Sequence, residues 1–200
     1  MHTEISRRER KKDETRSRIF HAAIDLFRKK GFEQTTVDEI TERADVAKGT
    51  FFNYFPRKES VLGFLSEIRL LEVEANAGRM LEECRPAREK LLELYATAAT
   101  SYEEDHDLSR YVVLELMGRA FASSEDLAMR WNELVVRLIR QGHDWGELRR
   151  DVDAARLEAF LTGIYYATIY TWVCCPQEAV FPLRDELRAR LTLAMEGVAA

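Results

Sequence analysis

The sequence predicts an all-α chain of about nine helices, with an N-terminal three-helix head and a larger C-terminal helical domain. Apolar residues recur at helical spacing through most of the 200 residues, and helix start and stop signals separate these segments. Only four prolines interrupt the pattern. With 46% hydrophobic and 32% charged residues, the composition is typical of a folded globular chain that is long enough for a sizeable core.

The first predicted elements lie between residues 18 and 59. Their first helix has one apolar face, formed by Ile19, Ala22, Ala23, Leu26 and Phe27. Gly31 follows three basic residues, and cations followed by a glycine favour the end of a helix. Thr36 and Glu39 then have the spacing of a capping box, which predicts that a short second helix begins after Thr36.

Residues 45–47 predict a tight turn into a third helix. This helix is too short to be stable alone, and we expect Phe51, Phe52 and Phe55 to hold it by aromatic packing. Two short helices joined by a tight turn form a helix-turn-helix, whose second helix enters the major groove of DNA. Polar side chains suited to such a groove occur on the third helix: Lys48, Thr50, Asn53 and Tyr54.

The segment resembles the DNA-binding head of the TetR family of bacterial transcriptional regulators. The residues that carry the resemblance are Ala22, Ala23, Leu26, Phe27, Gly31, Thr35, Thr36, Ile40, Ala44, Val46, Gly49, Thr50, Phe55, Lys58 and Glu59. The close match covers about a fifth of the chain, and the length and helical remainder also fit the family. The resemblance implies a helix-turn-helix DNA-binding domain over residues 18–59 and an effector-binding and dimerisation domain over residues 60–200.

The chain departs from the family pattern at four positions of the head. It has Asp45 where glycine is usual, Ala47 for serine, Phe52 for tyrosine and Tyr54 for histidine. Loss of a serine N-cap costs about 0.5–2 kcal/mol of local helix stability. Phe52 lacks the hydroxyl with which family tyrosines contact phosphate, and Tyr54 offers a hydroxyl nearby.

The resemblance also implies which side chains meet double-stranded DNA. We expect Thr50 and Asn53 to contact bases. Phosphate contacts are expected from Thr36, Lys48, Tyr54 and Lys58. Residues 1–17 form a basic arm that either adds phosphate or minor-groove contacts or is a solvated terminus. The charge distribution fits, because residues 1–60 carry a net +3 whereas residues 61–200 carry −8.

Residues 60–200 contain the expected effector site. Aromatic side chains are frequent in its middle helices, and ligand pockets are mostly apolar with a few placed polar groups. We therefore expect a small apolar or aromatic effector, although aromatics at helical spacing also occur as plain core. The expected lining residues are Tyr111, Met117, Trp131, Tyr165 and Tyr166. Arg69 or His143 would suit an acidic ligand, but a surface position is the alternative for each.

The last two predicted helices are candidates for subunit assembly. The penultimate helix is apolar nearly all round, which indicates burial on two sides, and the last has a narrow apolar stripe. In the family, these two helices of each subunit form an intermolecular four-helix bundle, so the resemblance implies a homodimer on a palindromic operator. The expected interface residues are Leu157, Leu161, Ile164, Leu187 and Leu191; the alternative is an intramolecular core.

The sequence thus predicts a ligand-responsive transcriptional regulator, most often a repressor in this family, that an effector releases from DNA. An activator of the same family and a helical interaction protein without DNA binding remain alternatives. An enzyme is not expected, because the four histidines are scattered and show no metal-ligand or nucleophile–base spacing. We expect no cofactor and no metal.

The sequence also limits where the protein is located and what its cysteines do. The polar N-terminus does not resemble a signal peptide, and no apolar run is long enough to span a membrane, so a cytoplasmic protein without membrane contact is expected. Cys84, Cys174 and Cys175 do not form a secreted disulfide framework. We expect them to be small buried hydrophobes, with a redox or metal-thiolate role as the alternative.

Overall fold

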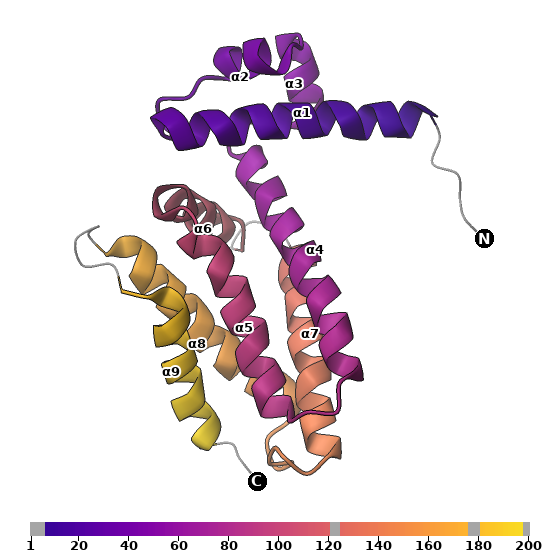
Figure 1. Ribbon diagram of the computed structural model, residues 1–200, viewed down its shortest axis with the longest axis vertical. Helices are drawn as coiled ribbons and strands as arrows, with labels where there is room; N and C mark the ends of the chain where they lie inside the picture. The colour runs from indigo at the N-terminus through magenta and orange to yellow at the C-terminus, as the bar shows by residue number, and fades with distance from the viewer. Residues whose placement is uncertain (1–6, 121–124, 176–180, 198–200) are drawn as a thin grey trace. The chain divides into compact units, whose positions relative to one another are not determined.

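The computed structural model describes residues 7–120, 125–175 and 181–197, and it confirms the all-α prediction (Figure 1). Within these ranges the helices are α1 (Arg7–Lys30), α2 (Val37–Ala44), α3 (Lys48–Tyr54), α4 (Ser60–Glu82), α5 (Ala87–Glu103), α6 (His106–Ala120), α7 (Glu125–Asp144), α8 (Ala154–Cys174) and α9 (Leu183–Glu196). The chain divides into two compact units, with unit 1 ending at Leu65 and unit 2 beginning at Ser66. The division falls inside α4, a few residues after the predicted limit at residue 59.

Unit 1 is built around the apolar face of α1. Figure 1 shows α2 and α3 on the same side of α1. The buried side chains of this core are Ile19, Phe20, Ala23, Phe27, Ile40, Phe51, Phe55, Val61 and Leu62. Phe51 and Phe55 point inward from α3, with ring centroids 5.8 Å apart, and Phe55 lies 5.9 Å from the ring of Phe64. The predicted packing of Phe51 and Phe55 is confirmed, whereas Phe52 faces solvent.

The predicted basic arm is helical from Arg7 onward, so α1 begins well before residue 18. Arginine, lysine and glutamate are good helix formers, and Arg10 lies one turn before Glu14 at an ion-pair distance of 3.8 Å. The guanidinium of Arg16 lies 3.8 Å from the centre of the Phe64 ring. Residues 7–17 are therefore the first turns of α1 and not an arm before it, because their charged side chains favour a helix.

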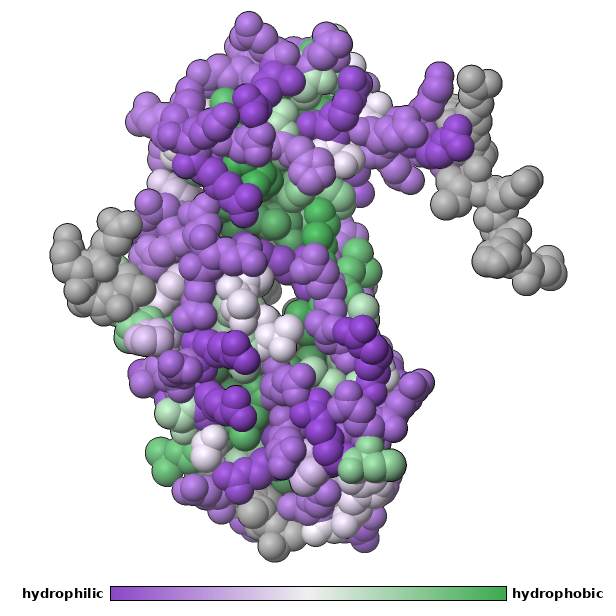
Figure 2. Space-filling view, viewed as in Figure 1, coloured by the Kyte–Doolittle hydropathy of each residue, from purple (hydrophilic) through white to green (hydrophobic). Residues whose placement is uncertain are grey.

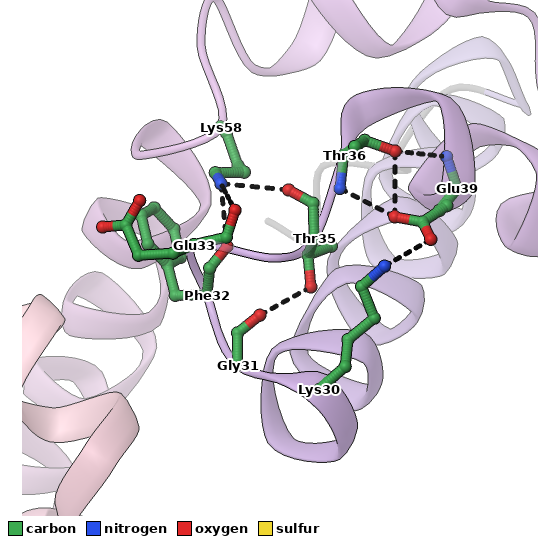
Figure 3. Close-up of polar contacts among 8 residues, drawn as sticks. All are labelled: Lys30, Gly31, Phe32, Glu33, Thr35, Thr36, Glu39 and Lys58. Carbon is green, nitrogen blue, oxygen red and sulfur yellow. Dashed lines mark hydrogen bonds and ion pairs between the residues drawn. The ribbon is translucent and has the colours of Figure 1, made fainter.

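The connection between α1 and α2 is formed by local capping contacts (Figure 3). Gly31 has φ 87° and donates its N–H to the carbonyl of Phe27 at 2.9 Å, which ends α1 as predicted. The capping box is also confirmed. The hydroxyl of Thr36 accepts from the N–H of Glu39 at 3.3 Å, and the Glu39 carboxylate accepts from the N–H of Thr36 at 2.9 Å.

The turn between α2 and α3 contains two residues that are unfavourable for their positions. Asp45 is in the left-handed region, with φ 51° and ψ 56°, where a glycine has no steric cost. Ala47 is the N-cap of α3 and makes no side-chain cap hydrogen bond. The turn therefore forms without the two side-chain choices that favour it most, and the buried phenylalanines of α3 have to compensate.

Unit 2 is a helical bundle in which α5 packs against α6, α7 and α9, while α8 packs against α6, α7 and α9 (Figure 1). Glu74 of α4 pairs with Arg130 of α7, and the Nε–Oε1 distance is 2.8 Å. Lys90 of α5 is fully buried, and its ammonium donates to the carbonyl of Glu83 at 2.5 Å and to the side chain of Gln141 at 2.8 Å. These contacts join the C-terminal end of α4 to α5 and α7.

The cysteines are not the buried hydrophobes that the sequence predicted. Cys84 and Cys174 are exposed, Cys175 is half-buried, and all three are free thiols. Among the described residues, no three His, Cys, Asp or Glu side chains gather as they would around a metal ion. In the same part of the chain, every helix is too short or too polar to cross a membrane.

Replacement of Ala47 by serine should stabilise the protein. A serine at this N-cap can accept a hydrogen bond from the first turn of α3, and we expect the free energy of unfolding to rise by about 0.5–2 kcal/mol. Urea unfolding of Ala47→Ser and wild type measures the difference. Ala47→Val offers no oxygen, so an equal gain in that variant would contradict the capping explanation.

The capping box of α2 should make stability depend on acidity. The pKa of Glu39 is lowered from 4.5 to about 2, first by the hydrogen bond from Lys30 and then by the Thr36 N–H and hydroxyl. The ionised Glu39 carboxylate therefore contributes its full stabilisation of the folded state above pH 4.5, and this contribution is lost as the pH falls to about 2. We expect the stability difference between wild type and Glu39→Gln to shrink across this window in urea titrations.

Lys30→Ala provides the matching test of the cause of this shift. Without the ammonium, the pKa of Glu39 should rise, and the stabilisation should be lost at a higher pH than in wild type. A difference between wild type and Glu39→Gln that does not change with pH would exclude the ionised capping box as its source.

Candidate nucleic-acid interface and effector site

The outer face of α3 carries the residues that were predicted to meet DNA. Lys48, Phe52 and Asn53 are exposed, while Thr50 and Tyr54 are half-buried. This division follows from packing, since the inward-facing phenylalanines leave the opposite side of the helix to solvent. Figure 2 shows that unit 1 presents a mainly hydrophilic surface in this view. Thr50 and Asn53 thus lie on the side of the helix opposite Phe51 and Phe55, whereas Lys48 is exposed at the first turn of the helix.

Lys48 is held at the surface by an ion pair between the two helices of the helix-turn-helix. Its ammonium lies 2.7 Å from the Oδ1 atom of Asp38, and both side chains are more than half exposed. An exposed pair of this kind contributes about 0–1 kcal/mol. Lys48 can therefore exchange Asp38 for a phosphate at little cost.

Lys58 has a different environment from the one the sequence predicted. Its ammonium donates to the carbonyl oxygens of Phe32 at 2.7 Å and Thr35 at 3.0 Å, and it lies 4.3 Å from the centre of the Phe32 ring (Figure 3). These contacts use a half-buried side chain to hold the loop between α1 and α2. Lys58 thus anchors this loop, and its phosphate contact stays a prediction.

Thr36 is exposed, as a phosphate contact requires, but its hydroxyl also serves the capping box. The hydroxyl donates to the Glu39 carboxylate at 2.9 Å while it accepts from the Glu39 N–H. A phosphate at this position would have to share the hydroxyl with the cap. The N-terminus of α2 nevertheless supplies backbone N–H groups that favour anions.

Two of the expected effector residues lie together in the interior of unit 2. Trp131 and Tyr165 are buried and stack with ring centroids 5.2 Å apart. The sequence did not identify Thr162, whose hydroxyl accepts from Trp131 Nε1 at 3.2 Å and lies 2.9 Å from the hydroxyl of Tyr95. One turn of α8 separates Thr162 from Tyr165, and this spacing was the available signal.

Of the other expected lining residues, Tyr166 borders this group, because its ring centroid lies 5.3 Å from that of Tyr165. Tyr111 is half-buried, Tyr166 is 38% exposed, and the side chain of Met117 lies outside the described residues. Arg69 is not a free surface residue, because its guanidinium lies 5.2 Å from the centre of the Tyr102 ring. His143 is half-buried near the end of α7.

The expected interface leucines are buried within the single chain. Leu157, Leu161, Leu187 and Leu191 are 0–1% exposed within the single chain, and Ile164 is half-buried. The four leucines are therefore part of the core of unit 2, the alternative that the sequence left open, and a role at a subunit interface stays a prediction. Apolar side chains that α8 and α9 do expose are Phe160, Tyr166, Tyr170 and Leu193.

Comparison with known families covers nearly the whole chain. Residues 19–63 match the family described as bacterial regulatory proteins of the tetR family. Residues 67–197 match the C-terminal domain of TetR/AcrR family transcriptional repressors. The two matches meet near the division between unit 1 and unit 2.

Individual relatives agree with this assignment. FadR from Thermus thermophilus, a TetR-family transcriptional repressor solved in complex with lauroyl-CoA, is 33% identical, with a TM-score of 0.76 over 91% of this chain and 94% of that one. FadR from Bacillus subtilis, solved with stearoyl-CoA, is 23% identical, with a TM-score of 0.72 over 91% and 98%.

A further relative is similar to the chain over most of its length. The fatty acid metabolism regulator protein of Bacillus subtilis is 26% identical over 167 residues, which are 80% of this chain and 84% of that protein. The helix-turn-helix geometry and the two family matches agree along the sequence. The chain therefore belongs to the TetR family of bacterial transcriptional regulators, which are not enzymes.

Proposed function

We propose that this protein is a repressor that binds a palindromic operator as a homodimer and leaves it when a fatty acyl-CoA binds. The observation that carries the effector class is the 33% identity, over 91% of the chain, to a repressor solved with lauroyl-CoA. The similarity to a fatty acid metabolism regulator supports the same class. The sequence predicted a small effector that is apolar or aromatic. We propose an acyl thioester in its place.

The geometry of α3 supports the DNA-binding part of the proposal. Asn53 is exposed at the position where an amide can read a base edge, and Thr50 lies on the half-buried edge of the same face. Lys48 has only a weak surface partner to leave. We assign base contacts to Thr50 and Asn53 and phosphate contacts to Thr36, Lys48 and Tyr54.

The homodimer is supported by apolar surface that the single chain leaves uncovered. Phe160 and Tyr170 of α8 and Leu193 of α9 are exposed, with Leu193 reaching 72%. Figure 2 shows green apolar patches among the hydrophilic surface of unit 2. Packing these helices against their copies in a second subunit would remove this surface from water. The resulting two-fold symmetry matches a palindromic DNA site.

The interior of unit 2 suits the acyl part of the proposed effector. Its buried side chains are predominantly aliphatic and aromatic, and the buried hydroxyls of Tyr95 and Thr162 are hydrogen-bonded to each other. An acyl chain is stabilised by such surroundings by about 0.8 kcal/mol for each methylene that is removed from water. The proposed switch needs a differential affinity for the two states of about 1–3 kcal/mol.

Alanine at Lys48 and at Lys58 should have different effects. Lys48→Ala removes one phosphate contact from each subunit of the proposed dimer, so we expect weaker DNA binding and a fall of about 1.8 in the slope of log K against log salt, about 0.9 for each contact. Lys58→Ala removes a loop anchor, and it should lower the free energy of unfolding by about 1–3 kcal/mol. Fluorescence anisotropy at several salt concentrations and urea unfolding measure both effects.

The DNA target for this measurement is a duplex from upstream of the protein's own gene, with a scrambled duplex as competitor. The assignments of the two lysines would be reversed if Lys58→Ala changed the salt slope while leaving stability intact. Equal binding of both duplexes by wild type would contradict an operator in that region.

Lauroyl-CoA should release the protein from its operator. We expect saturating thioester to weaken DNA binding about 5–150-fold, the range of ordinary allosteric coupling. Anisotropy of the labelled operator, titrated with lauroyl-CoA, measures the release. Coenzyme A without an acyl chain is the matched control and should leave the complex intact. Release by both compounds, or by neither, would contradict the proposed effector.

A further inference from the structure

Three aromatic side chains from three helices meet in the interior of unit 2. We call Tyr95 of α5, Trp131 of α7 and Tyr165 of α8 the aromatic wall. All three are buried, with 0–5% of their surface exposed. Their ring centroids are 5.2–5.4 Å apart in every pairing. The aromatic wall thus joins α5, α7 and α8 through rings that contact one another.

The spacing of the rings excludes an alkyl chain from between them. Carbon atoms in contact are about 3.5–4.0 Å apart, so a chain between two ring faces needs the faces to be roughly 7–8 Å apart. Trp131 and Tyr165 are stacked at 5.2 Å with an angle of 19° between their planes. A methylene chain that reaches this pair must therefore stop or displace a ring.

Hydrogen bonds hold the rings in this arrangement. Thr162 Oγ1 accepts from Trp131 Nε1 at 3.2 Å and is 2.9 Å from the Tyr95 hydroxyl. The hydroxyls of Tyr102 and Tyr165 also pair with each other. Rotating any of these rings away would leave a buried polar atom without a partner, which is costly. The aromatic wall is therefore a fixed boundary rather than an adaptable surface of the kind methionines form.

The wall also reaches toward α4. Tyr102 lies two turns after Tyr95 on α5, and the guanidinium of Arg69 on α4 lies 5.2 Å from the centre of its ring. Together these groups extend from α4 through α5 to α7 and α8. These groups form a continuous boundary that an acyl chain bound in the same interior would have to stop at or displace.

We propose that the aromatic wall sets the longest acyl chain that the effector site accepts, with Trp131 as its principal determinant. The proposal rests on the proposed function, because it concerns the same acyl thioester. Below the limit, affinity rises about fourfold with each added methylene, the factor that corresponds to burial of one CH₂. Beyond it, each further methylene has no space, so the affinity stops rising and then falls.

The test compares CoA thioesters from hexanoyl to stearoyl by isothermal titration calorimetry with the full-length protein. Trp131→Ala opens space beyond the wall, and we expect its best-bound chain to be longer than that of wild type by at least two carbons. Trp131→Leu keeps an apolar side chain in the core and should shift the optimum in the same direction by less. Met129→Ala, an exposed position on the same helix, should leave the optimum unchanged.

The outcomes separate the wall from the effector class. If Trp131→Ala does not fold, as its circular dichroism melting curve will reveal, Trp131→Leu carries the test. Thioesters that bind wild type and Trp131→Leu with the same dependence on length overturn the aromatic wall and leave the acyl-CoA effector standing. Failure of every thioester to bind wild type overturns both.

Discussion

The presentation of the recognition helix depends on the burial of two phenylalanines. α3 has seven residues, too few for a helix to be stable in water by itself. Phe51 and Phe55 fix it to the core of unit 1, and they lie four positions apart on one face. Because two such anchors set the rotation of a helix about its axis, they also decide that Asn53, on the opposite side, faces solvent. The surface that we propose for reading DNA is thus a consequence of the apolar packing behind it.

The positions of backbone carbonyls decide what the lysines of this protein do. Lys58 and Lys90 lie far apart in the sequence, yet both donate to carbonyl oxygens beside helix ends, where helical hydrogen bonding leaves acceptors without partners. Lys48 pairs instead with the solvated carboxylate of Asp38. A lysine on this surface is consequently available to a phosphate only where its ammonium is not already bound to backbone carbonyls.

The sequence revealed what local chemistry decides and missed what depends on distant packing. Gly31 and the Thr36–Glu39 pair act within four residues of themselves, so their roles were predicted correctly. Periodicity likewise identified the apolar stripe containing Leu187, but it does not say which chain covers a stripe, and here it is the same chain. The spacing between Thr162 and Tyr165 is visible in the sequence, but the two aromatic partners of Thr162 come from other helices, and no local pattern shows them.

α4 contributes residues to both units, and this limits how effector binding can change DNA binding. Val61 and Leu62 at its start are buried in unit 1, whereas Gln141 donates to the carbonyl of Leu81 near its end at 3.0 Å. The buried Lys90 and the pair between Glu74 and its arginine add further contacts along the part in unit 2. An effector therefore acts on DNA binding only so far as it binds one arrangement of α4 better than another.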